Sequence, residues 1–177
     1  MIESYNELLE NLKPLFTRIV VTGPQRSSTR FVAKALSSSL SCEYVDEFSY
    51  MSWEDFQKKE KAVYQTPLHC HDIHNIPEDK KTCVIFMQRR IEDICASEKR
   101  VGWRHFYLEK KAYNKAFPLL NLNLYNCNGE MKQDIWARYQ KPIMKVTFFD
   151  FNHDAIKDAP GYISRKERKH FHALQVK

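Results

Sequence analysis

The stretch RIVVTGPQRSSTRFVAKAL, residues 18–36, combines the pattern of a buried strand with that of an amphipathic helix. The apolar run at its start predicts a short buried strand over 18–22. Gly23 and Pro24 then end the strand, and apolar residues at helical spacing predict a helix over 28–40. A strand that passes through a tight turn into a helix is typical of an α/β fold.

The turn between this strand and this helix carries groups suited to an anion. The first N–H groups of the helix are exposed at the carboxyl edge of the sheet, and the helix dipole adds partial positive charge. Ser27, Ser28 and Thr29 supply hydroxyl donors, and Arg26 supplies a guanidinium that fits phosphate or sulfate oxygens. The sequence therefore predicts a phosphate-binding loop. The alternative interpretation is a Ser/Thr-rich helix cap that holds no ligand.

This loop is not a Walker A motif. That motif, G-x-x-x-x-G-K-[ST], contains a lysine, and no lysine stands at the corresponding place after Gly23. The missing lysine disfavours hydrolysis of ATP or GTP.

The rest of the chain continues the alternation of strands and helices. Together these segments predict a single α/β domain over residues 1–177, with a central, mostly parallel sheet flanked by helices. Strands are expected at 42–48, 62–70, 81–88 and 143–151, and helices at 3–13, 91–100 and 162–176.

A second turn with basic residues follows the strand expected at 81–88, in the stretch CVIFMQRRIEDICASEKR. Arg89 comes directly after this strand, and Ser97 lies eight residues further along. Ligands of parallel α/β sheets bind at the carboxyl ends of the strands, so the two turns can converge there. Two phosphate sites could then hold the two ends of one nucleotide.

These motifs resemble those of the sulfotransferases that use 3′-phosphoadenosine 5′-phosphosulfate (PAPS). The first loop of that family reads roughly G-x-[PQ]-[KR]-S-G-T-T and a bulky residue, and this chain has GPQRSSTRF from Gly23 to Phe31. The second motif reads R-x-P-x-D-x-x-x-S, and this chain has RRIEDICAS from Arg89 to Ser97. A weaker similarity links IWARYQKPIMKVTFFDF to the family's tryptophan helix and the strand that ends in Y-E-D-L. The resemblance covers roughly residues 17–151.

The resemblance implies a P-loop NTPase-like sulfotransferase fold. It implies in-line transfer of a sulfuryl group from PAPS to a hydroxyl or amine of a small-molecule or glycan acceptor, which leaves 3′-phosphoadenosine 5′-phosphate (PAP). The first loop would hold the 5′-phosphosulfate, Arg89 and Ser97 would hold the 3′-phosphate, and Arg26 would stabilise the developing charge. No metal is required where side-chain cations supply that stabilisation. The expected PAPS-binding residues are Gly23, Gln25, Arg26, Ser27, Ser28, Thr29, Arg30, Arg89 and Ser97.

The chain departs from the family pattern at three positions of these motifs. Ser28 stands where the family prefers glycine, Arg30 replaces the second threonine, and Ile91 replaces the proline. The carboxyl-terminal motif R-K-G-x-x-G is missing, and Arg165 or Lys166 is only a weak substitute. A catalytically inactive member of the family is therefore one alternative.

The candidate catalytic base lies in VYQTPLHCHDIHNIP. Family members carry K-T-H-x-P at about this point, and alignment on that motif gives His71 the base position. His69 suits the role nearly as well, because alternate residues of a strand share a face and imidazole titrates near neutral pH. Some relatives use glutamate, which makes Glu47 a third candidate. Alternatively, His69 and His71 are surface residues, or they form a metal site with His74.

The composition favours a soluble globular protein. Hydrophobic residues make up 43% and charged residues 28% of the 177 residues. No run approaches the roughly 18–20 apolar residues of a membrane helix, and the acidic, amphipathic start MIESYNELLENLKP does not read as a signal peptide. The five cysteines form no CxxC motif, which favours reduced thiols. We therefore expect a cytoplasmic protein without a membrane partner.

The net charge of +6 favours an anionic partner, although much of it lies in SRKERKHFH, a pattern typical of a solvated helix face. One alternative function is a small nucleotide or metabolite kinase with a degenerate phosphate loop; the missing lysine counts against it. Another is a non-catalytic protein that binds a nucleotide or a polyanion. Nucleic acid is not the expected partner, because the basic residues are not interleaved with aromatic ones.

Overall fold

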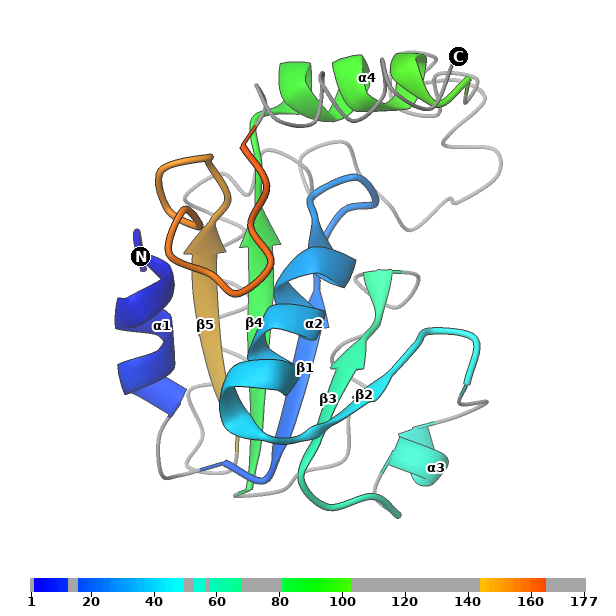
Figure 1. The fold of residues 1–177 in the computed structure, drawn as a ribbon. Helices are drawn as coiled ribbons and strands as arrows, with labels where there is room; N and C mark the ends of the chain where they lie inside the picture. The colour runs from blue at the N-terminus through cyan, green and yellow to red at the C-terminus, as the bar shows by residue number, and fades with distance from the viewer. Residues whose placement is uncertain are drawn as a thin grey trace, which may run out of the picture.

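A parallel sheet forms the centre of the fold in the computed structural model (Figure 1). The structure describes residues 2–12, 16–49, 53–56, 58–67, 81–102 and 144–164. The strands are β1 (Arg18–Thr22), β2 (Glu43–Val45), β3 (Ala62–Gln65), β4 (Thr82–Gln88) and β5 (Met144–Asp150). Their order across the sheet is β2-β3-β1-β4-β5, and every neighbouring pair within the described residues is parallel. The expected α/β fold with a mostly parallel sheet is confirmed.

Strand β1 is central, and its neighbours differ in length. Val20 pairs with Tyr64 of β3 on one side and with Val84 of β4 on the other. All residues of β1, β3 and β4 are buried, as expected for near-continuous apolar runs in a parallel sheet. The strand predicted at 62–70 ends earlier, at Gln65, shortly before Pro67, which has no N–H to donate to a strand ladder.

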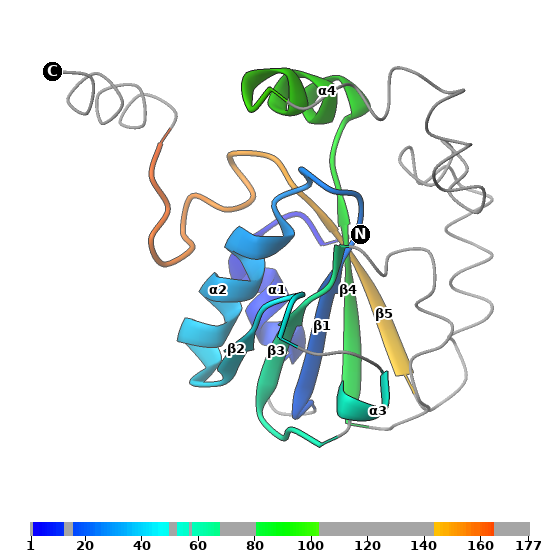
Figure 2. The same cartoon turned by 90° about the vertical axis from the view of Figure 1, so that its right-hand side faces the viewer.

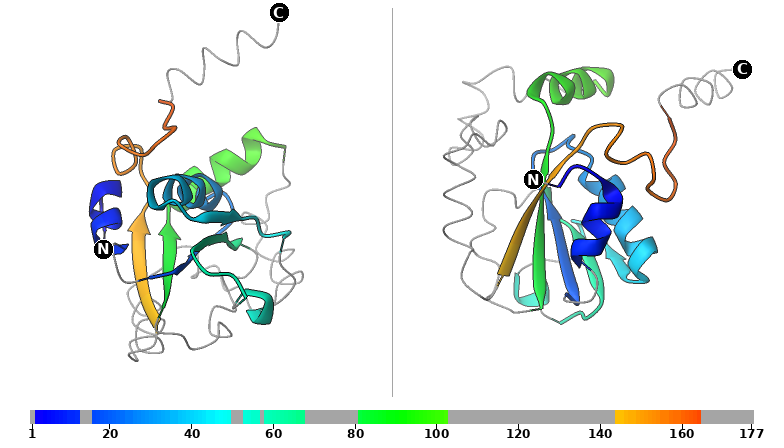
Figure 3. Two further views of the ribbon diagram at one scale, coloured as in Figure 1. Left: turned by 60° about the horizontal axis from the view of Figure 1, so that its bottom comes forward. Right: turned by 90° about the vertical axis from the view of Figure 1, so that its left-hand side faces the viewer.

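The helices lie on different sides of this sheet. Helices α1 (Tyr5–Leu12) and α2 (Thr29–Leu40) cover the same face, as Figure 2 shows. The single turn of α3 (Trp53–Phe56) lies near the amino end of β3. Helix α4 (Ile91–Arg100) crosses beyond the carboxyl ends of β1 and β4 in all views (Figures 1 and 3). The helices predicted at the positions of α1, α2 and α4 are confirmed, whereas most of the one predicted at 162–176 lies outside the described residues.

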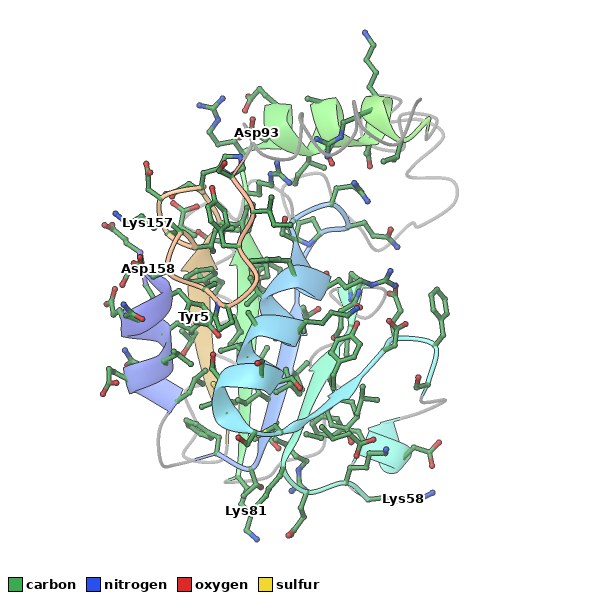
Figure 4. The ribbon with its side chains drawn as sticks, in the orientation of Figure 1. Tyr5, Lys58, Lys81, Asp93, Lys157 and Asp158 are labelled. Carbon is green, nitrogen blue, oxygen red and sulfur yellow. The ribbon has the colours of Figure 1, made fainter. Side chains whose placement is uncertain are left out.

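The core forms between the sheet and helices α1 and α2. Leu8, Leu36 and Ile85 are all fully buried there. The hydroxyl groups of Tyr5 on α1 (labelled in Figure 4) and Ser39 on α2 lie 2.9 Å apart and join the two helices by a hydrogen bond. This packing fixes the position of α2, and with it the loop that enters α2 from β1.

Two further expectations concern cysteines and membrane helices. Cys42 and Cys95 carry free thiols, Cys83 is buried in β4, and Cys70 and Cys127 lie outside the described residues. None of the helices in the described ranges is long and apolar enough to cross a bilayer.

Candidate anion-binding site

The β1–α2 loop begins at Gly23, which lies directly against β4. Gly23 has a φ of 130°, and a Cβ atom at this position would lie 2.7 Å from the carbonyl oxygen of Met87. Any larger residue would push the loop away from β4. Gly23 therefore holds the loop at the carboxyl edge, next to the point where Arg89 leaves β4.

The loop then turns through two residues in the left-handed region. Arg26 has a φ of 65° and Ser28 a φ of 70°. Ser27, between them, is fully buried, and its hydroxyl donates to the carbonyl oxygen of Pro24 at 2.5 Å. Ser28 is the N-cap of α2 but makes no side-chain hydrogen bond to the helix. The Ser27 hydroxyl thus stabilises the turn, whereas the hydroxyl of the partly buried Ser28 makes no hydrogen bond to α2.

Arg26 joins this loop to α4. Its Nε and Nη2 atoms donate to Oγ of Ser97 at 3.1 and 3.0 Å. Nη2 of Arg100 donates to the same oxygen at 3.3 Å, and Nη1 of Arg89 donates to the carbonyl oxygen of Arg26 at 2.8 Å. The structure therefore brings together Arg26, Arg89 and Ser97, which the sequence placed in two separate motifs.

Arg89 also contacts an aromatic ring that sequence reasoning did not assign to the site. Its guanidinium carbon lies 5.2 Å from the centre of the Phe151 ring, within cation–π range. The N–H of Phe151 donates to the carbonyl oxygen of Gln88 at 2.8 Å, which aligns the residue after β5 with the end of β4. The signal for Phe151 was present in the sequence, since it closes the FFDF segment that resembles the family's third motif.

Glu98 is a second residue that the sequence analysis missed. Its side chain is fully buried on α4, where Ile94 and Ser97 are buried as well. Neither carboxyl oxygen has a hydrogen-bond partner in the described part of the chain. Burial raises the pKa of Glu98 to about 7, and the positive charge of Arg26 partly opposes this rise. The spacing of Glu98 from Ile94, four residues apart on one helix, could have indicated a buried acid.

Arg30 lies outside this network, although it was expected to bind PAPS. Its Nε donates to Oε1 of Gln65 at 3.3 Å, and its Nη2 forms an ion pair with Asp46 at 3.3 Å. The hydroxyl of Tyr44 lies 2.7 Å from the same Gln65 oxygen. Burial and the neighbouring Asp46 raise the pKa of Tyr44 to about 12. Arg30 thus connects α2 to the ends of β2 and β3.

The remaining predicted residues lie partly inside and partly outside the described residues. Gln25 is partly exposed in the loop, Thr29 is the buried first residue of α2, and Glu47 is partly buried after β2. The candidate bases His69 and His71 lie outside the described residues, as do His74, Arg165 and Lys166. Within the ranges that the structure describes, no group of three or more His, Cys, Asp or Glu side chains could hold a metal ion.

Charged side chains of both signs act on Arg26. Burial and the nearby charge of Arg100 lower the pKa of the Arg26 guanidinium, whereas Glu98 raises it. The guanidinium groups of Arg26 and Arg100 both contact the Ser97 hydroxyl, and that of Arg89 contacts the backbone of Arg26. Guanidinium groups are well suited to bind phosphate or sulfate oxygens. Comparisons of the chain with protein-family models, with curated proteins and with solved structures found no match.

Proposed function

We propose that this protein is a PAPS-dependent sulfotransferase with a P-loop NTPase-like sulfotransferase fold. The observation that carries the proposal is the contact between the two motifs: Arg26 of the first motif donates to Ser97 of the second, and Arg89 donates to the backbone of Arg26. A protein that binds a nucleotide with phosphates at both ends needs two anion sites close together. In a parallel sheet, the carboxyl ends of the strands are where ligands bind.

The conformation of Ser28 supports the comparison with the family loop. The family prefers glycine at this position, and Ser28 has the left-handed φ of 70° that glycine adopts without steric cost. The backbone at Ser28 therefore has the conformation that a glycine would adopt, although the residue is a serine. Gly23, the other glycine position, is likewise one at which a side chain would collide with β4.

The proposed reaction is an in-line displacement at sulfur. The acceptor oxygen or nitrogen forms a bond to sulfur while the bond from sulfur to the bridging oxygen of PAPS breaks, and the electron pair of that bond stays on the phosphate of PAP. His71 or His69 takes the acceptor proton. Arg26 stabilises the negative charge that develops on the leaving phosphate. The acceptor is a small molecule or a glycan.

The first experiment is a calorimetric titration of the protein with PAP, beside ADP and AMP. We expect PAP to bind at micromolar concentrations and ADP to bind much more weakly, because ADP has no 3′-phosphate for Arg89 and Ser97. Replacement of Arg89 by alanine should weaken PAP binding by about 10-fold or more, since a charged hydrogen bond contributes roughly 1.5–3 kcal/mol.

Arg90→Ala is the matched control. Arg90 is the neighbouring residue, but its exposed side chain pairs with Glu92 and Asp93 rather than with the loop. This variant should bind PAP almost as tightly as the unmodified protein. Equal binding of PAP, ADP and AMP, or no binding of any, would contradict the proposed function.

A further inference from the structure

Glu98 is a buried acid beside the anion site, and the sulfotransferase pattern ends at the residue before it. Its side chain is fully buried, and both carboxyl oxygens lack a hydrogen-bond partner in the part of the chain that the structure describes. Glu98 and Arg26 lie close enough for the charge of each to shift the pKa of the other. An ionised carboxylate without hydrogen bonds is unfavourable in such a position. The ionised form of Glu98 therefore needs a positive charge nearby.

Arg26 offsets part of this charge, but burial still outweighs its effect on the pKa of Glu98. Arg26 attracts the Glu98 carboxylate electrostatically, and it donates two hydrogen bonds to Ser97, the residue next to Glu98. Within the described residues, the other charged and titratable groups linked to this pair are Arg89 and Arg100, which contact the same network, and Cys95 of α4, whose pKa Glu98 raises. Glu92 acts on Cys95 rather than on the pair. The Arg26 guanidinium is thus shared between Glu98 and the place where a phosphate would bind.

We propose that Glu98 is a positioning residue of the phosphate site that acts through Arg26: its carboxylate retains Arg26 at Ser97, and its protonation releases Arg26 to the phosphate of the nucleotide. A bound phosphate and the Glu98 carboxylate compete for one guanidinium, and their repulsion is strong where water is excluded. Binding of phosphate therefore favours the protonated form of Glu98 and draws one proton from solvent. The inference rests on the proposed function, because the phosphate is that of PAP or PAPS.

The test is calorimetric titration with PAP at about pH 8, once in Tris and once in HEPES. The two buffers have different heats of ionisation, so the difference between the measured binding heats gives the number of protons taken up. The phosphates of PAP are almost fully ionised at this pH because their second pKa is about 6, so the ligand itself takes up few protons. We expect the unmodified protein to take up a substantial fraction of one proton per PAP. Glu98→Gln should lose this uptake and should bind PAP several-fold more tightly at about pH 8.

At about pH 6, where Glu98 is mostly protonated in the unmodified protein, the two proteins should bind PAP equally. Glu92→Gln is the matched control, because Glu92 is an exposed acid on the same helix. It should retain the proton uptake. Glu98→Met is a second neutral variant, used with the same readout if Glu98→Gln does not fold.

Equal proton uptake by Glu98→Gln and the unmodified protein would overturn the inference. Weaker PAP binding by Glu98→Gln at both pH values, with unchanged uptake, would do so as well, because it would show a structural role alone. If PAP binds and Arg89→Ala weakens the binding by about 10-fold or more, either of these results leaves the proposed function standing. If neither the unmodified protein nor any of its variants binds PAP, the proposed function is wrong, and this inference is wrong as well.

Discussion

Arg26 and Ser97 are joined by two hydrogen bonds, from Nε at 3.1 Å and from Nη2 at 3.0 Å to the serine Oγ. They connect the β1–α2 loop to α4 across the carboxyl edge of the sheet. Arg100 adds a third donor at 3.3 Å to the same oxygen. A hydroxyl oxygen has two lone pairs, so these donors occupy its acceptor capacity and leave its proton to be donated elsewhere. The Ser97 hydroxyl can therefore donate its own proton to one further acceptor, and in the proposed function that acceptor is a phosphate of PAP.

The first prediction concerns this hydroxyl. Ser97→Ala removes both the proposed donor to the anion and the acceptor of two hydrogen bonds from Arg26. We expect PAP to bind about 10-fold more weakly, because a hydrogen bond to a charged group is worth roughly 1.5–3 kcal/mol. Titration calorimetry measures the change. Ser38→Ala on the exposed face of α2 is the control and should bind PAP normally. Unchanged binding by Ser97→Ala would remove Ser97 from the site.

Much of the fold could be predicted from the sequence, because its parallel strands are short apolar runs and its helices have clear apolar faces. The runs at β1 and β4 predicted both strands within a residue of their observed bounds. The lateral order of the strands was not predictable in this way. Local patterns place residues on strands, whereas only tertiary packing decides that β3 lies between β1 and β2.

The candidate site could be predicted in part. The two turns that carry Arg26 and Arg89 were found from their sequence, and the structure brings them together. Sequence reasoning did not separate Arg30 from Arg26, because both are arginines of one motif. The two arginines make different contacts because they lie on different parts of the chain. Arg30 is four residues further along, in the first turn of α2, and contacts Asp46 and Gln65. The roles proposed for His69 and His71 stay predictions.

The second prediction concerns the left-handed conformation of Ser28. A residue with a Cβ atom loses about 1–2 kcal/mol there, and glycine avoids that loss but is more flexible in the unfolded chain. We therefore expect Ser28→Gly to raise the free energy of unfolding by about 0.5–1 kcal/mol. Urea denaturation measures it. In contrast, Ser38→Gly on the exposed face of helix α2 should lower stability by about 0.5 kcal/mol.

The third prediction concerns the contact between Gly23 and β4. Gly23→Ala would place a Cβ atom 2.7 Å from the backbone oxygen of Met87, so the loop must move. We expect a loss of about 2–3 kcal/mol in the free energy of unfolding, from steric overlap together with an unfavourable φ. PAP affinity should fall as well, because the loop carries Arg26.

Gly102→Ala separates the effect of steric overlap from the effect of the unfavourable φ. Gly102 also has a positive φ, of 72°, but no atom of the described residues lies within 4 Å of the place that its Cβ atom would take. This variant should lose only the conformational part, about 1 kcal/mol. Equal losses at the two glycines would show that the approach of Gly23 to β4 contributes nothing.

The last prediction concerns the pH dependence of stability through Glu98. The pKa of its carboxyl is about 7 in the folded protein, against an ordinary value of 4.5. Between these two values the unfolded chain has released a proton that the folded protein still holds, so the folded state binds more protons. Folding stability therefore falls as the pH rises through this window. The full shift corresponds to about 3 kcal/mol, which is present below about pH 4.5 and lost above about pH 7.

Glu98→Gln removes this titration because the amide is neutral at every pH. We expect urea denaturation at intervals from about pH 5 to about pH 8 to show the unmodified protein losing stability relative to Glu98→Gln by roughly 2–3 kcal/mol. Glu92→Gln, which changes an exposed acid on the same helix, should follow the unmodified protein. Parallel curves for Glu98→Gln and the unmodified protein would mean that Glu98 is ionised in the folded state across this range. Water or a neighbouring cation would then have to compensate its charge fully, and Glu98 could not respond to a bound phosphate by taking up a proton.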